Sequence, residues 1–250
     1  MRVTSHNDRC RFPSTVWRAI RNAGLEPSAI LRAAGLPATI HLDASACLST
    51  AQLFSIWKAV EVLSKDETFA LRVIAGADGA GHQPAFITAL YASDFRDGIH
   101  RLLRFKRVAS IERFWTHEED GMWMLGRDWP FATEPEPATS VDLAFASLVE
   151  LGRRGTRQHL VPLRVEFIRD HPRSEGLERY FGCSIEYGAE RNTIVFASCD
   201  LDILFPGYSP EFLELVAPGL QSALEEIKVG ATITERIKTI CSILRTCRIN

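Results

Sequence analysis

The spacing of apolar residues changes part-way along the chain, and this change constrains the fold more than any other feature of the sequence. In the first part apolar residues recur every three or four positions, as Leu53, Ile56 and Val60 do, which is typical of amphipathic helices. Residues 110–117 instead form an aromatic-rich run whose alternation is typical of a β-strand. The sequence therefore predicts helices first and a sheet afterwards.

The second part of the chain predicts a hairpin followed by further strands. Asp120 and Gly121 separate the runs 110–117 and 122–128, and an Asp-Gly pair between two such runs is a strong signal for a tight hairpin turn. Helices are expected between the hairpin and the later strands. Those later strands are expected at residues 163–168, 184–187 and 192–197. This order predicts an α+β fold with a mostly antiparallel sheet and flanking helices.

These patterns divide the chain into three expected parts. Residues 1–107 form a helical N-terminal part, residues 108–206 form the α+β part of the same domain, and residues 207–250 form C-terminal helices. The C-terminal helices carry an apolar stripe that we expect to join two copies of the chain, although it could equally pack on the chain's own sheet. The stripe consists of Phe212, Leu215, Val216 and Leu220.

Composition excludes several classes of protein. The chain has 29 Lys and Arg against 31 Asp and Glu, a net charge of −2, which disfavours nucleic-acid binding by this chain alone. No apolar run reaches the roughly 18 residues of a membrane span, and the N-terminus lacks the apolar segment of a signal peptide. These features predict a cytoplasmic protein that does not bind membranes. The six cysteines form no Cys-x-x-Cys pair, so we expect free thiols and no metal site.

Catalytic signatures are mostly absent. The sequence has no Gly-x-Ser-x-Gly elbow, no His-Glu-x-x-His motif and no phosphate-binding loop of the Walker type. We therefore expect that the chain has no catalytic residues and no cofactor, and that it is not an enzyme. Two alternatives remain open at this stage: a small cytosolic enzyme with a dispersed active site, and a module that only binds other proteins.

The order of several segments is similar to a known family. These segments are Ala34-Gly35-Leu36-Pro37, residues 53–62, residues 69–76, residues 84–93 with the helix that follows to Lys106, residues 180–189, residues 192–196 and residues 201–206. Together they resemble the N-terminal arabinose-binding-like sensor domain of AraC-family transcriptional regulators, in the subgroup typified by ornithine-utilisation regulators. The resemblance covers roughly residues 15–245, and none of its motifs is catalytic.

The resemblance implies a function and a set of partners. It implies an effector-sensing, dimerising domain that binds a small metabolite, with an amino acid or an organic acid suggested by the subgroup, and that acts as a homodimer. Members of the family contact DNA through a C-terminal module with two helix-turn-helix motifs. This chain ends at Asn250, near where that module would begin, so we expect DNA binding to need a module absent from this chain.

A sensor needs a cavity, and aromatic walls with one or two charged groups are typical of small-molecule sites. We expect the ligand between the hairpin and the helix before it. Arg113 would be the polar anchor, and the alternative is that the aromatic rings are sheet core and Arg113 is a surface residue. If Arg113 faces water, His82 or Arg127 becomes the next candidate. The full set of candidates is Phe86, Tyr91, Arg113, Trp115 and Trp123.

Overall fold

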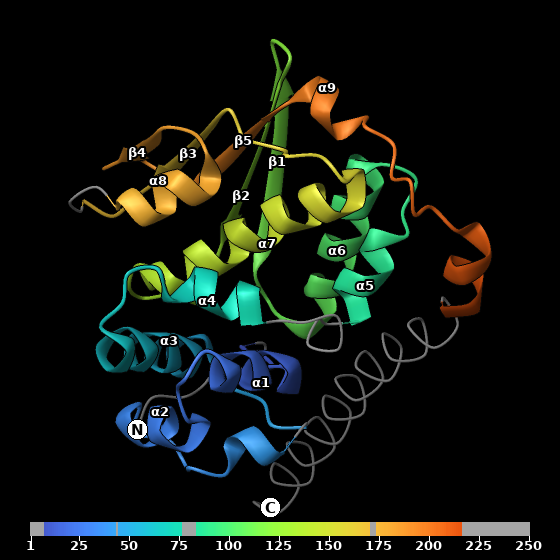
Figure 1. The fold of residues 1–250 in the computed structure, drawn as a ribbon. Helices are drawn as coiled ribbons and strands as arrows, with labels where there is room; N and C mark the ends of the chain where they lie inside the picture. The colour runs from blue at the N-terminus through green and yellow to red at the C-terminus, as the bar shows by residue number, and fades with distance from the viewer. Residues whose placement is uncertain (1–7, 44, 77–83, 171–173, 217–250) are drawn as a thin grey trace, which may run out of the picture. The chain divides into compact units, whose positions relative to one another are not determined.

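The computed structural model describes residues 8–43, 45–76, 84–170 and 174–216 (Figure 1). The chain divides into two units, residues 1–209 and 210–250. The described part of the first unit combines helices with a five-stranded sheet, which confirms the predicted α+β class.

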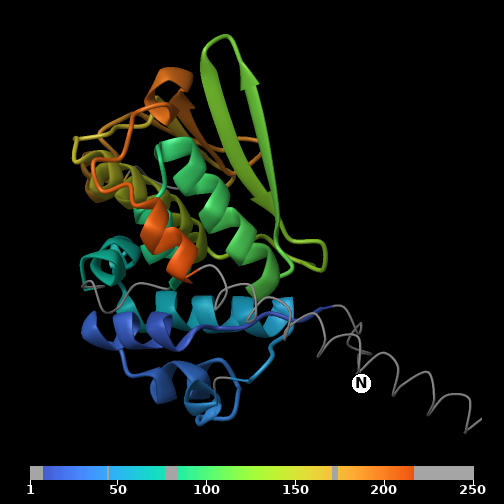
Figure 2. The same ribbon diagram turned by 90° about the vertical axis from the view of Figure 1, so that its right-hand side faces the viewer.

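The N-terminal helices form one layer, seen below the rest of the first unit in both views (Figures 1 and 2). Local sequence sets where they begin. Pro27 occupies the first turn of its helix, and Ser49 forms a capping box with Gln52 at the start of the longest one. The elements of this layer are α1 (Ser14–Asn22), α2 (Pro27–Ala33), the short 3-10 helix η1 (Ile40–Leu42), α3 (Thr50–Ser64) and α4 (Phe69–Gly76).

The sheet and its helices form the second layer. Strand order is β1-β2-β5-β3-β4, and every pairing is antiparallel except that of β3 with β4. The strands are β1 (Arg113–Glu119), β2 (Met122–Asp128), β3 (Arg164–Phe167), β4 (Ile185–Tyr187) and β5 (Thr193–Ala197). The helices are α5 (Pro84–Leu90), α6 (Phe95–Ala109), α7 (Ala138–Thr156), α8 (Glu175–Phe181) and α9 (Ser198–Leu201).

The hairpin predicted from Asp120 and Gly121 is present and joins β1 to β2, which rise together beside α6 (Figure 2). Asp120 has φ +51° and Gly121 has φ +73°. Two successive residues with positive φ are the mark of the type I′ turn, whose twist matches that of the strands it joins. Asp and Gly tolerate this conformation better than most residues, so the turn follows from the sequence.

The two layers have separate apolar cores. The N-terminal core includes Trp17, Ile20 and Val73, whereas α5 and α6 pack with the sheet in the second core. There Phe95 of α6 meets Phe196 of β5 edge to face, with 5.3 Å between ring centroids. The cores thus divide between α4 and α5. Helical spacing does not reveal which core a helix joins, and the predicted division after residue 107, where helices give way to strands, stays a prediction.

In the second unit, residues 210–216 are helical. Of the predicted stripe, Leu215 is 79% exposed, Phe212 and Val216 are half-buried, and Leu220 lies outside the described residues. The role of the stripe in dimerisation stays a prediction. Within the described part of the chain, no helix is both long and apolar enough to span a membrane.

Candidate ligand-binding site

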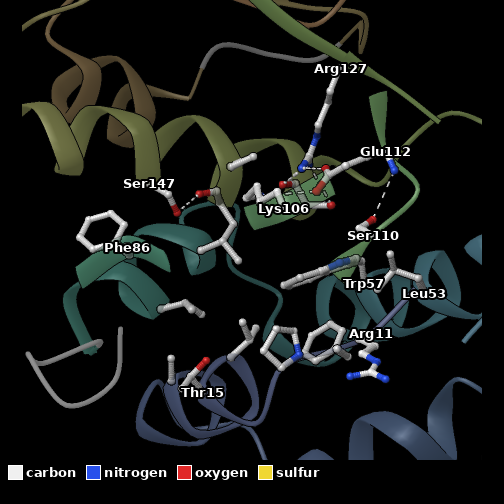
Figure 3. Close-up of a pocket in the computed structure, with 18 of the residues that line it drawn as sticks. Arg11, Thr15, Leu53, Trp57, Phe86, Lys106, Ser110, Glu112, Arg127 and Ser147 are labelled. Carbon is white, nitrogen blue, oxygen red and sulfur yellow. Dashed lines mark hydrogen bonds and ion pairs between the residues drawn. The ribbon is translucent and has the colours of Figure 1, made fainter. Parts of the chain in front are cut away.

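A cavity of about 180 Å³ lies where the two layers meet (Figure 3). Helices α1, α3 and α4 line it from the N-terminal layer, and α5, α6, α7 and β2 line it from the other layer. Most of its wall is apolar. The apolar wall comprises Phe12, Val16, Leu53, Trp57, Val73, Ile74, Phe86, Leu102, Trp129 and Leu143.

Helical spacing places the lining residues on single faces of their helices. Ser140, Leu143, Ala144 and Ser147 follow one another on α7 at steps of three, one and three, which keeps them on one side of that helix. The small side chains at positions 144 and 147 leave space that larger residues would fill. The cavity therefore depends on the small residues of α7 as well as on the packing of the two layers.

One end of the cavity is formed by a buried charged cluster around Arg127 of β2. Its side chain is 5% exposed, as is that of Glu112, and that of Glu136 is 6% exposed. Arg127 Nη1 donates to Glu112 Oε2 at 2.8 Å, Nε donates to Glu136 Oε2 at 3.2 Å, and Nη2 donates to Glu136 Oε1. Nη2 also donates to the backbone carbonyl of Ser140 at 2.8 Å. Arg127 is thus held by two carboxylates and a carbonyl.

Lys106 of α6 reaches the same end of the cavity (Figure 3). Its ammonium lies 3.7 Å from Glu112 Oε1, which is longer than a normal hydrogen bond, and 5.7 Å from the centroid of the Phe114 ring. Burial lowers the pKa of Lys106 because it disfavours the charged form, and the nearby Glu112 carboxylate opposes this shift. The Lys106 side chain is thus a half-buried cation, 25% exposed, whose carboxylate partner is distant.

Two further polar atoms of lining residues are buried without a partner. Thr15 Oγ1 and Trp129 Nε1 make no hydrogen bond with any described residue. A buried donor without a partner costs free energy, and such groups are uncommon in folded proteins. In Figure 3 Thr15 and Lys106 approach the cavity from opposite sides. These groups indicate that the cavity suits a molecule that supplies hydrogen-bond acceptors.

The structure does not bring the five predicted ligand residues together. Phe86 lines the cavity, and Trp123 is buried in the core beside it. The hairpin register places Arg113 and Trp115 on the opposite face of the sheet, where Arg113 is exposed and Trp115 carries Arg191 over its ring at 5.5 Å. Tyr91 is not among the lining residues of the cavity. An exposed Arg113 is not placed to anchor a ligand there, which corrects that expectation.

The two substitute anchors have different outcomes. Arg127 does line the cavity, but its guanidinium is already paired with Glu112 and Glu136. His82 lies outside the described residues. Sequence reasoning missed Lys106, although it follows Leu102 by four positions on the buried side of α6 and this spacing was visible.

A second cavity, of about 230 Å³, lies between the N-terminus of α7 and the end of β3. Most of the residues that line it are polar, and they include the ion pair of Asp142 with Arg169, at 2.7 Å. Burial raises the pKa of Asp142 to about 6, against the opposing effect of Arg169. In the part of the chain that the structure describes, no group of three or more metal-binding side chains is present.

Comparison with known families and with solved structures gives matches of both kinds. Residues 24–203 match the family described as the arabinose-binding domain of AraC transcription regulators, N-terminal. The fold is similar to that of the transcriptional regulator CdpR from Pseudomonas aeruginosa, with a TM-score of 0.57 and 10% sequence identity. This similarity covers 85% of this chain and 65% of that one, just under two thirds. No curated protein matches the sequence.

Proposed function

Because this chain belongs to the family of N-terminal arabinose-binding domains of AraC transcription regulators, we propose that it senses a small effector molecule in the cavity between its two layers. In this proposal the chain also dimerises, and the bound effector controls DNA binding by a separate C-terminal module. The proposal assigns no catalytic step to the chain.

The observation that carries the proposal is the character of the cavity. Its walls are apolar, and three lining side chains, Thr15, Lys106 and Trp129, hold polar groups that are unpartnered or only distantly paired. Small-molecule sites combine apolar walls with a few polar groups in this way. The volume of about 180 Å³ is below the roughly 300–1,000 Å³ of sites for drug-sized molecules, which favours a small metabolite.

Helix α6 supports the idea that the cavity is coupled to the C-terminal side of the domain. Lys106 lies near the C-terminal end of α6, at the cavity. The N-terminal end of α6 is hydrogen-bonded to the segment that precedes residue 210. There Phe95 N donates to Ile203 O at 3.2 Å, and Phe205 N donates to Ser93 O at 3.0 Å. A rigid helix that touches both places is the kind of element that can transmit a change between two sites.

The test is a thermal-shift screen of the purified chain against common metabolites, followed by calorimetry on the molecules that stabilise it. Ala144→Trp fills the cavity from α7 and should abolish binding of a true effector. Ala33→Trp places the same side chain on the exposed side of α2 and should leave binding unchanged. Binding that survives Ala144→Trp, or a screen without any ligand, would contradict the proposal.

A further inference from the structure

We propose that the ligand of this cavity is a small monoanion with an apolar body, a carboxylate on an aliphatic or aromatic group without a charged amino group, and that Lys106 is the cation that pairs with it. This inference rests on the proposed function of the cavity as an effector site. It goes further by naming the chemical class of the ligand and the residue that selects it.

The first argument is the direction of the unsatisfied hydrogen bonds. Trp129 Nε1 and the Lys106 ammonium are donors only, and the Thr15 hydroxyl can donate as well. All three side chains line the same cavity. A carboxylate offers two acceptor oxygens and no donor, so it satisfies these groups without leaving a polar atom of its own unpaired.

The second argument is that Arg127, the buried cation at this end of the cavity, is not available. Arg127 has three of its nitrogens bound to Glu112, Glu136 and Ser140, so an incoming anion would have to break contacts that are already short. Lys106 is 3.7 Å from its carboxylate partner and gains more from a new anion than it loses. Of the two cations at this end of the cavity, Lys106 is the one placed to bind the ligand.

The third argument is the balance of charge around the cavity. Among the described lining residues the cations are Arg11, which is exposed, Lys106 and Arg127, and the carboxylate is Glu112, with Glu136 behind it on Arg127. The buried and half-buried charges balance at two positive and two negative, and the exposed Arg11 adds one positive charge, weakened by solvent, that a monoanion would meet. An ammonium group would add to this positive charge instead, and its carboxylate partners are already held by Arg127.

The fourth argument disfavours a sugar. Each hydroxyl of a buried sugar needs its own hydrogen-bond partner, and an unpaired one is costly. Among the polar lining groups, Ser147 Oγ already donates to Leu143 O at 2.6 Å and Ser140 Oγ donates to Glu136 at 2.6 Å. The remaining wall is mainly aliphatic and aromatic, which suits the body of an apolar acid.

The experiment compares ligands that share one body and differ only at the polar end. Calorimetry on the full chain would use hexanoate, hexan-1-ol and 2-aminohexanoate, and then 3-phenylpropanoate against phenylalanine. In at least one series we expect the acid to bind ten-fold or more tightly than the matched alcohol and amino acid. Lys106→Met should then lower the affinity for the acid at least ten-fold and leave that for the alcohol unchanged.

Lys58→Met is the matched control, because Lys58 pairs with Glu134 at 2.6 Å on the surface of α3 and is half exposed. It should change neither affinity. The proposal is overturned if in neither series the acid binds more tightly than its matched compounds, if Lys106→Met leaves the affinity for the acid unchanged, or if no acid binds. None of these results decides whether the cavity binds an effector, which the Ala144→Trp variant tests. The ligand class and the sensing function can therefore fail separately.

Discussion

Replacing Arg127 with methionine would remove the centre of the buried charged cluster. The guanidinium is 5% exposed and holds two carboxylates, those of Glu112 and Glu136, that are themselves only 5% and 6% exposed. Breaking a buried ion pair from one side costs about 3–5 kcal/mol, because the remaining charge stays buried without a partner. Methionine keeps much of the side-chain volume, so the added cost of an empty space is small. We therefore expect a loss of about 3–5 kcal/mol in the free energy of unfolding.

Urea unfolding measures this loss as a lower midpoint at an unchanged slope. Arg164→Met is the matched control, since Arg164 is also on a strand and pairs with Glu166 at 2.6 Å, but it is 35% exposed and should cost below about 1 kcal/mol. Adding Glu136→Gln to Arg127→Met should recover part of the loss. A cost for Arg127→Met no larger than that of the control would refute the reasoning.

Three further predictions concern the rest of the chain. Gly155→Ala should lower the melting temperature by several degrees, because a Cβ there would lie 2.1 Å from the Phe205 ring; an unchanged temperature would contradict this packing. Burial raises the pKa of Asp142 from 3.8 to about 6 against the effect of Arg169, so the folded state binds the extra proton. As the pH rises from 4 to 6, the free energy of unfolding should therefore fall by up to about 3 kcal/mol relative to that of Asp142→Asn. A difference between the two proteins that does not change with pH would contradict this prediction. Leu215→Glu should convert dimers to folded monomers in sedimentation, since Leu215 is 79% exposed, and an unchanged mass would count against the predicted interface.

Much of the local structure follows from the sequence because it depends on nearby residues. Ser49 and Gln52 cap α3, Gly182 ends α8 in the left-handed conformation, and Asp120 with Gly121 makes the hairpin turn. In each case the decisive interaction spans fewer than five residues. The helices, the strands and the α+β class could therefore be predicted before any tertiary contact was known.

The buried face of the hairpin could not be predicted in this way. Both faces of β1 carry an aromatic residue beside charged ones, Phe114 on one and Trp115 on the other. The choice depends on α6, which packs on the face of the sheet that carries Trp123 and Leu125. Gly126 lies opposite Trp115, and a Cβ there would come within 2.3 Å of that ring. This pairing places Trp115 over a glycine on the outer face, away from the cavity.

The charged end of the cavity could be predicted only in part from local sequence. The positions Phe95, Ile99, Leu102 and Lys106 follow steps of four, three and four, so the spacing that identifies the buried side of α6 also includes the lysine. In the sequence this lysine looks like part of a basic, solvated helix face. Its surroundings come from Glu112 before β1, Arg127 in β2 and the residues before and within α7, which no local rule brings together. The place of this lysine on the buried side of α6 can thus be inferred from one helix, but its partners, and so its capacity to bind an anion, depend on the fold.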